Sequence, residues 1–234
     1  MKIIMGLPGR DEQIENYIKT LHNMRKVGIP VLGHHFCPTW AWRTTISKPY
    51  RCGATVSAYN QADEDKAPNA YAVSKYHMIN MEKKDNPPLP VVAGVERIFI
   101  SKEDFLKAEK IADNPAWGIN LCMGTFSQLG GEECVLDMIR EFAPKKRIHM
   151  VHFRDVQGTV NNFSECFLGE GRYNPCRIMR ELSGYGYEGL VLDDHVPYLT
   201  NDTRWGHTSR AYEFGYICGM ASMMKYDNEA AAVH

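Results

Sequence analysis

Short apolar runs alternate with amphipathic stretches along most of this sequence. The apolar runs have the length of buried β-strands and lie at residues 2–5, 29–36, 118–122, 147–153 and 189–194. The stretches with apolar residues three and four apart predict amphipathic helices at residues 14–25, 102–112, 131–142, 175–182 and 212–224. Strands that alternate with helices are typical of α/β proteins with a parallel sheet, which include the (β/α)8 barrels.

The length of the chain limits how complete such a barrel is. A (β/α)8 barrel typically takes about 250 residues, and this chain has 234. Residues 49–89 are rich in charged and small polar side chains, and they predict no buried strand and one short helix at residues 71–81. We therefore predict a single domain over residues 1–234, with an α/β fold that is TIM-barrel-like but incomplete.

Composition excludes several classes of partner and location. Lys plus Arg number 27 and Asp plus Glu number 28, so the formal net charge of -1 argues against nucleic acid as a partner. No apolar run approaches the roughly 20 residues that cross a bilayer, and the first residues lack a signal-peptide pattern. The seven cysteines are odd in number and include no CxxC pair. We therefore expect a cytoplasmic protein without a disulfide framework.

Side chains that can bind a metal follow the predicted strands at their C-terminal ends. They are Cys122, His152, the run Asp193, Asp194 and His195, and the pair His34 and His35. In a parallel barrel all these strand ends lie on one face, which carries the active site. Each residue alone also fits a buried or hydrogen-bonded structural role, but two adjacent carboxylates are costly to bury unless paired or metal-bound. The pattern as a whole predicts one site.

Two arginines are candidates for binding an anion at this site. Arg154 lies two residues after His152, so both side chains point to the same side of a strand. A guanidinium beside a metal can hold a carboxylate through two parallel hydrogen bonds. An ion pair of Arg154 with Asp155 or Glu165 is the structural alternative. Arg43 follows another strand-end loop and is the second candidate.

Several stretches of the chain resemble the mannonate dehydratases, the TIM-barrel enzymes of hexuronate breakdown. The matching stretches include WAWRTT, DNPPLPVVAGVERIF, INLCMGTFSQLGG, HMVHFRDVQGTVNNFSECF, LVLDDHVP and DTRWGHTSRAYEFGY. The resemblance implies a cytoplasmic, metal-dependent hydro-lyase of glucuronate catabolism. Such an enzyme removes water from a small sugar acid, D-mannonate, to give 2-keto-3-deoxy-D-gluconate, and its metal is Mn²⁺ or Fe²⁺.

The resemblance also assigns roles to residues of this chain. It implies metal binding by Cys122, His152 and Asp194, catalytic roles for His195, Arg154 and His207, and substrate binding by Arg43, Arg154 and Arg210. In this scheme His195 is the acid/base residue. A thiolate, an imidazole and a carboxylate suit Mn, Fe, Co or Zn better than Mg or Ca.

The chain departs from the family pattern at one point. The family has a further histidine ligand in a stretch H-P-D-D-P-P, whereas this chain has KKDNPP there, with Lys83 at the ligand position. His77 is a conceivable substitute. The resemblance also implies that βα units before Met1 and one internal unit are missing.

Two other functions therefore stay open at this stage. The chain is either an active dehydratase or a truncated or degenerate homologue without catalysis. A sugar isomerase or epimerase barrel is a third interpretation, but such enzymes use carboxylate-rich metal sites and Cys122 argues against it. Missing units leave sheet edges exposed, so we also expect a homo-oligomer.

Overall fold

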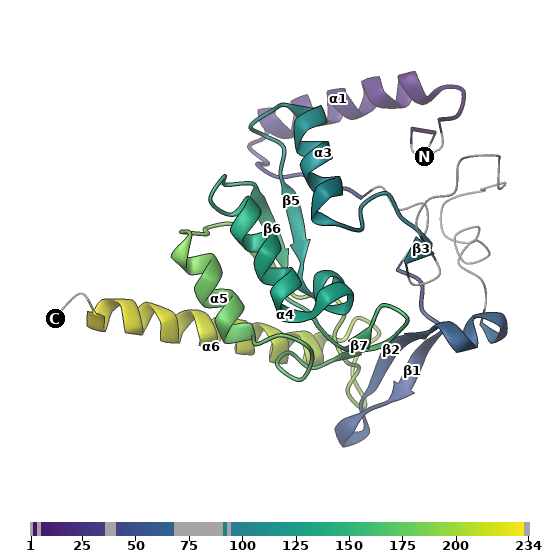
Figure 1. Cartoon of the computed structure of the whole chain (residues 1–234), viewed down its shortest axis with the longest axis vertical. Helices are drawn as coiled ribbons and strands as arrows, with labels where there is room; N and C mark the ends of the chain where they lie inside the picture. Colours follow the sequence, from purple (N-terminus) through teal and green to yellow (C-terminus); the bar gives the residue numbers. More distant parts are fainter. Residues whose placement is uncertain (1, 4–5, 36–40, 68–90, 93–94, 232–234) are drawn as a thin grey trace.

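The protein is a mixed α/β chain with three separate sheets in its described part (Figure 1). The computed structural model describes residues 2–3, 6–35, 41–67, 91–92 and 95–231. The strands are β1 (Thr45–Pro49), β2 (Thr55–Asn60), β3 (Val91–Val92), β4 (Val95–Glu96), β5 (Ile119–Cys122), β6 (Ile148–His152), β7 (Asp155–Thr159), β8 (Asn162–Cys166) and β9 (Leu190–Leu192). The α-helices are α1 (Arg10–Lys26), α3 (Lys102–Ala112), α4 (Met123–Phe142), α5 (Pro175–Gly184) and α6 (His207–Ala231), and short 3-10 helices span Arg51–Gly53 and Gln61–Lys66.

The first sheet is parallel, with the strand order β5-β6-β9. Its strands fall on the predicted runs at residues 118–122, 147–153 and 189–194, so these predictions are confirmed. The register pairs Cys122 with His152 and His152 with Leu192. The three strands therefore end level with one another, and the residues that follow leave the sheet at one edge.

The second sheet is antiparallel, with the order β1-β2-β8-β7. Sequence patterning missed it, and the prediction that residues 49–89 hold no buried strand is wrong because β2 has three buried side chains. The strands β7 and β8 form a hairpin, and Gly158, in β7 just before the turn, has φ +92°, a conformation that favours glycine. The third sheet is the short antiparallel pair of β3 and β4.

The sheets of the described residues do not close into a barrel, so the predicted incomplete TIM barrel is reduced to a mixed α/β fold with one parallel sheet. Residues 29–35 form no strand, although an apolar strand was predicted there, and Lys2 and Ile3 lie in a turn. Ile29 is 49% exposed and Leu32 is 37% exposed, so this apolar run packs on no sheet of the described residues. The helix predicted at residues 71–81 lies outside the described residues.

All five helices predicted in the described part are present, with some shifted ends. The helix α4 begins at Met123, eight residues before the predicted start, and Gly131 at φ +73° separates its two segments. The helix α3 begins with a capping box of Ser101 and Asp104, and Pro175 occupies the first turn of α5 after the Asn174 cap. The helix α6 begins at His207, before the predicted residue 212.

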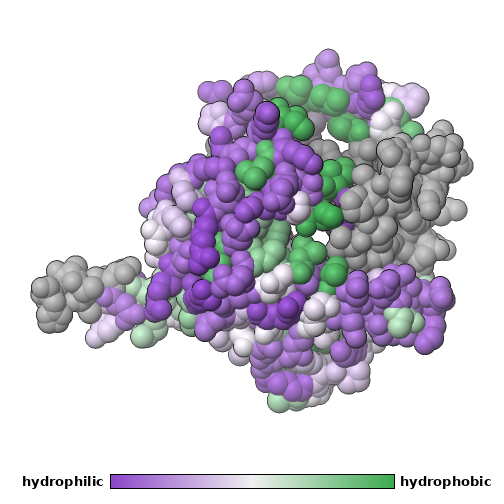
Figure 2. Space-filling model, viewed as in Figure 1, coloured by the Kyte–Doolittle hydropathy of each residue, from purple (hydrophilic) through white to green (hydrophobic). Residues whose placement is uncertain are grey.

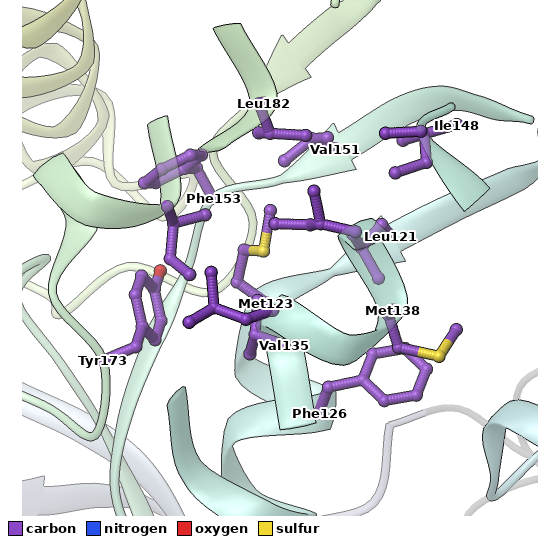
Figure 3. Close-up of a cluster of buried hydrophobic side chains, with 14 of the residues drawn as sticks. Leu121, Met123, Phe126, Val135, Met138, Ile148, Val151, Phe153, Tyr173 and Leu182 are labelled. Atoms are coloured by element: carbon purple, nitrogen blue, oxygen red, sulfur yellow. The ribbon is translucent and has the colours of Figure 1, made fainter. Parts of the chain in front are cut away.

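The main hydrophobic core lies between the parallel sheet and α4 (Figure 3). Leu121 and Val151 come from β5 and β6, and Met123 and Val135 come from α4; all four are fully buried. Burial of each large apolar side chain stabilises the fold by about 1.5–3 kcal/mol before the loss of chain entropy. This core holds the sheet edge at which the strand-end residues meet.

The helix α1 differs because none of its side chains is buried. Its predicted apolar stripe lies on the surface, with Ile14, Ile18 and Leu21 each at least 40% exposed, and Figure 2 shows apolar atoms on this part of the molecule. Within the described residues, no helix is both long and apolar enough to cross a membrane.

Candidate metal and anion site

Three side chains that can bind a metal meet at the end of the parallel sheet. Cys122 ends β5, His152 ends β6 and Asp194 follows β9, as the strand-end pattern predicted. One ligand atom of each lies within 4.8 Å of the other two. The Asp194 Oδ2 atom is 4.0 Å from Cys122 Sγ and 3.7 Å from His152 Nδ1.

The spacing and chemistry of this cluster fit a transition-metal ion. Ligand bonds of about 2.0–2.3 Å place neighbouring ligand atoms roughly 3–4 Å apart, so small side-chain movements close the cluster around one ion. A mixed S, N and O donor set is suited to Mn, Fe, Co or Zn. The His152 side chain is 26% exposed and that of Asp194 is 24% exposed, so both side chains are partly in contact with solvent.

Asn120 orients the histidine of the cluster. Its Nδ2 atom lies 3.1 Å from His152 Nε2 and 3.5 Å from His152 Nδ1, the ring nitrogen that faces Asp194. Such outer partners fix the ring of a metal-binding histidine. Sequence analysis missed Asn120, although its position two residues before Cys122 on the same strand puts both on one face.

Arg154 is the main positive charge at the cluster. Its Nη1 atom lies 3.3 Å from Cys122 Sγ and 3.7 Å from Asp194 Oδ2. Burial raises the pKa of the Cys122 thiol, but Arg154 and the hydrogen bond to His152 outweigh burial, and the net shift of the pKa is downward. The hydrogen bond with Cys122 in turn raises the pKa of His152. The environment therefore favours the thiolate, which is the form that binds metals.

Arg154 also forms one of the ion pairs that were offered as its structural alternative. Its Nε atom donates to Glu165 Oε2 at 2.9 Å, while Asp155 instead accepts backbone N–H groups, including those of Val156 and Gly171. The two interpretations of Arg154 are thus compatible. The pKa of Glu165 is raised by burial but lowered more by its cationic neighbours, so the carboxylate stays ionised.

Arg43 reaches the same region from the other side of Glu165. Its Nη2 atom lies 2.7 Å from Glu165 Oε1, and its guanidinium lies over the Phe163 ring at 4.8 Å from the centroid. Burial lowers the pKa of Arg43, although an arginine in a protein stays charged. Glu165 thus links the two predicted anion-binding arginines.

His195 lies directly beside the cluster. Its Nε2 atom is 3.7 Å from Asp194 Oδ2, and 36% of its side chain is exposed. Burial lowers the pKa of His195. A neutral imidazole can accept a proton, so the geometry allows the predicted acid/base role without testing it.

The two remaining predicted residues lie further along the chain. Arg210 donates to Asp193 Oδ2 at 2.6 Å and so braces the residue next to Asp194. His207 begins α6, where its Nδ1 atom is 3.0 Å from Thr203 Oγ1. Across the described residues, His207 has no hydrogen bond or ion pair with the cluster, so its catalytic assignment stays a prediction.

The pair His34 and His35 is not part of this cluster. The Nδ1 atom of His34 lies 3.3 Å from the hydroxyl of Tyr17 on α1. His34 does not lie at the end of a strand. His35 likewise belongs to the strand-free segment at residues 29–35. His77 and Lys83 lie outside the described residues.

Comparison with known proteins identifies the family. A profile of the D-mannonate dehydratase (UxuA) family matches residues 1–81 and 72–230. The chain belongs to the D-mannonate dehydratase family. The mannonate dehydratases are hydro-lyases, and the resemblance noted from the sequence motifs is confirmed.

Individual members of the mannonate dehydratase family are distant relatives of this chain. The mannonate dehydratases of Thermotoga neapolitana and Brachyspira hyodysenteriae are each 26% identical to it over 278 residues, which cover 93% of this chain and 77% of theirs. The crystal structure of mannonate dehydratase from Streptococcus suis serotype 2 superimposes with a TM-score of 0.77 at 23% identity, covering 94% of this chain and 73% of that one. The latter match shows that the fold is shared.

The alignments also reveal an internal difference. They span 278 positions, more than the 234 residues of this whole chain, so the relatives have residues inside the aligned region that this chain lacks. The family profile matches in two pieces, which overlap at residues 72–81. This break coincides with the polar stretch in which the sequence predicts a missing unit.

Proposed function

We propose that this chain catalyses the metal-dependent dehydration of D-mannonate to 2-keto-3-deoxy-D-gluconate and water. The observation that carries the proposal is the cluster of Cys122, His152 and Asp194 with Arg154 against it, in a chain of the mannonate dehydratase family. Cys122, His152 and Asp194 hold the metal in this proposal, and the ion is Mn²⁺ or Fe²⁺. Cys122 argues against the isomerase and epimerase alternative, whose metal sites are rich in carboxylates.

The side chains around the cluster suit the recognition of a sugar acid. A buried guanidinium beside the ligands can bind the carboxylate at C1 of D-mannonate through parallel hydrogen bonds. Arg154 has this position, and Arg43 is linked to Arg154 because both form ion pairs with Glu165. Arg210 supports the loop through Asp193. In the proposal these three arginines bind and orient the substrate, directly or through their partners.

The reaction needs a base and an acid near the substrate. His195 removes the proton from C2, which is weakly acidic because it is next to a carboxylate. The C3–O bond then breaks, and the hydroxyl leaves as water with a proton from the acid. The enol that remains takes up a proton at C3 and loses the proton of its C2 hydroxyl, which gives the 2-keto product. The chemistry that a bound Mn²⁺ or Fe²⁺ supplies is stabilisation of the negative charge that develops as the C2 proton leaves.

The experiment that tests this function combines metal analysis with turnover. Purified protein is assayed for bound metal and for ketodeoxygluconate formation from D-mannonate, with and without added Mn²⁺ or Fe²⁺. We expect about one metal per chain and turnover that chelation abolishes and metal restores. Absence of both metal binding and turnover would refute the proposal.

A non-catalytic homologue is the second candidate function. It is favoured by the internal shortfall relative to the relatives and by the lysine at the expected position of a further ligand. The same assay separates the two, because a binding protein without catalysis would hold D-mannonate in calorimetry but release no product. His195→Asn sharpens the result, since it should abolish turnover and spare metal binding.

Three further assignments belong to the same proposal. The parallel sheet β5-β6-β9 is a segment of a (β/α) barrel within a single domain, a view that the fold shared with the Streptococcus suis enzyme supports. The protein acts in the cytoplasm in hexuronate breakdown, as the family and the unpaired cysteines suggest. It assembles as a homo-oligomer, which sedimentation analysis would test.

A further inference from the structure

Glu165 is a buried carboxylate that bridges two buried arginines. It lies on β8 with 1% of its side chain exposed, and the side chains of Arg43 and Arg154 are 8% and 6% exposed. Each carboxylate oxygen serves one arginine: Oε1 lies 2.7 Å from Arg43 Nη2, and Oε2 lies 2.9 Å from Arg154 Nε. Both guanidinium groups are therefore held by the same side chain.

This bridge leaves free hydrogen-bond donors in the interior. Glu165 is the carboxylate that pairs with Arg43, whereas Arg154 also faces the Asp194 carboxylate at 3.7 Å and Cys122 Sγ at 3.3 Å. Arg43 Nε and Arg154 Nη2 are buried and have no hydrogen-bond partner in the described part of the chain. Two spare N–H donors on a cationic pair suit the oxygens of a carboxylate.

The bridge also ties the arginines to the metal-ligand cluster. The Nη1 atom of Arg154 lies 3.3 Å from Cys122 Sγ, so the group that Glu165 orients contacts the site itself. Arg43 is held on its other sides by the Trp42 carbonyl and the Phe163 ring. Without Glu165 the two like-charged guanidinium groups repel each other and lose their common anchor.

We infer that Glu165 is a positioning residue that holds Arg43 and Arg154 together as a joint binding site for the carboxylate of the substrate. This inference rests on the proposed function, because it takes the sugar-acid carboxylate as the ligand. Glu165 acts through the two arginines and does not contact the substrate.

The test is the variant Glu165→Gln in the full chain, compared with the parent enzyme. Glutamine has one oxygen and no charge, so it can accept from only one arginine. We expect KM for D-mannonate to rise about tenfold or more while kcat stays within about threefold, because binding of the carboxylate is lost equally in ground and transition states. Metal content should not change. KM within twofold of the parent in a folded variant would overturn the inference and leave Glu165 a purely structural group.

Two further variants keep the result unambiguous. Glu170→Gln is the matched control, since Glu170 pairs with Arg51 at 2.6 Å and with the Tyr50 hydroxyl at 2.7 Å but contacts neither Arg43 nor Arg154. It should leave KM unchanged. If Glu165→Gln does not fold, Glu165→Asp decides: it keeps the charge but is one methylene too short to reach both arginines, so KM should still rise. An unchanged KM for this variant overturns the inference.

The failure of this inference can be told from the failure of the proposed function. A parent enzyme without turnover counts against the function, whereas an active parent with an unaltered Glu165→Gln variant counts against the role of Glu165 alone. Calorimetric binding of D-mannonate gives the same comparison without turnover. Weaker binding by Glu165→Gln than by the parent supports the bridge, and equal binding refutes it.

Discussion

The parallel sheet and the antiparallel sheet differ in how much charge is buried beside them. The core beside β5-β6-β9 is apolar, with Leu121, Val151 and Phe142 fully buried. The antiparallel sheet also buries apolar side chains, among them Val56 and Phe163, but it and the segments beside it bury the charged Arg154 and Glu165 as well. Burial of apolar side chains stabilises the core beside the parallel sheet. Buried charge, in contrast, opposes folding unless it is paired. The parallel sheet thus carries the strand ends at which the cluster lies, whereas the antiparallel sheet holds the buried ion pairs of Glu165 beside it.

The largest effect is expected from removing a candidate ligand at the end of the parallel sheet. Cys122→Ser should lose bound metal and lower kcat/KM at least roughly a thousandfold, about 4 kcal/mol of transition-state stabilisation. Metal analysis and the turnover assay measure both. The control is Cys176→Ser, which changes an exposed cysteine at the start of α5 and should leave both unaltered. Full activity of Cys122→Ser would remove Cys122 from the ligand set.

Two core substitutions ask whether the sheets unfold together. Phe142→Ala lies in the apolar core and Phe163→Ala in the antiparallel sheet, and each deletes a fully or almost fully buried ring. We expect each to lower the free energy of unfolding by about 3–5 kcal/mol. Denaturant unfolding followed by fluorescence and circular dichroism should give one shared transition. Two separate transitions in Phe163→Ala would mean that the antiparallel sheet is an independent unit.

The buried carboxyl of Glu213, on the helix α6, predicts that the stability of the fold depends on pH. Burial, with Asp193, Asp155 and Glu170 nearby, raises the pKa of Glu213 to about 8. The folded chain therefore binds more protons than the unfolded chain between the ordinary glutamate pKa and about pH 8, and stability falls as pH rises through this window. Glu213→Gln should remove this fall and raise Tm at pH 9 by several degrees, at about 2–4 °C per kcal/mol.

The measurement is a series of thermal melts from pH 5 to pH 9. At pH 5 the parent and Glu213→Gln should melt at similar temperatures, because the carboxyl is protonated in the folded parent. Glu188→Gln, which changes an exposed glutamate, should not alter the pH profile. A profile of Glu213→Gln that is parallel to that of the parent would contradict the assignment.

The smallest effect is expected from replacing the Arg43 guanidinium by a lysine ammonium, which changes the shape of the side chain but not its charge. Arg43→Lys keeps the positive charge but loses the planar fork that pairs with Glu165, so KM for D-mannonate should rise by about tenfold. Steady-state kinetics measure the change. Arg51→Lys in the neighbouring ion pair with Glu170 is the control, and its KM should equal that of the parent. Equal KM values for both variants would show that charge alone suffices at position 43.

The predictable part of the fold is the part whose signal is local. The runs that became β5, β6 and β9 are mostly apolar, and the candidate ligands stand at or just after their C-terminal ends, so the cluster could be expected from strand ends alone. The hairpin of β7 and β8 could not, because its buried Asp155 and Glu165 read as surface residues until their partners from distant segments are known. The apolar run at residues 29–36 failed for the converse reason: it has strand composition but no neighbouring strand in the described residues.

The site residues divide in the same way. Arg154 could be placed from its spacing to His152, and Asn120 could have been found by the same alternation. Arg43 and Glu165 meet across 122 positions of the chain, a relation that no local pattern contains. His207 was assigned from a motif, and the hydrogen bonds that it makes in the structure lie within the turn before α6.

The level ends of the parallel strands make the cluster a test of strand register. Side chains alternate between the two faces of a strand, so a slip of β6 by one residue past β5 would bring Val151 or Phe153 to the position opposite Cys122. Anything that binds Cys122, His152 and Asp194 together therefore binds only the correctly paired sheet and stabilises it by mass action. A metal ion bound at this site would therefore shift the folding equilibrium towards the sheet in which β5, β6 and β9 are paired in the correct register.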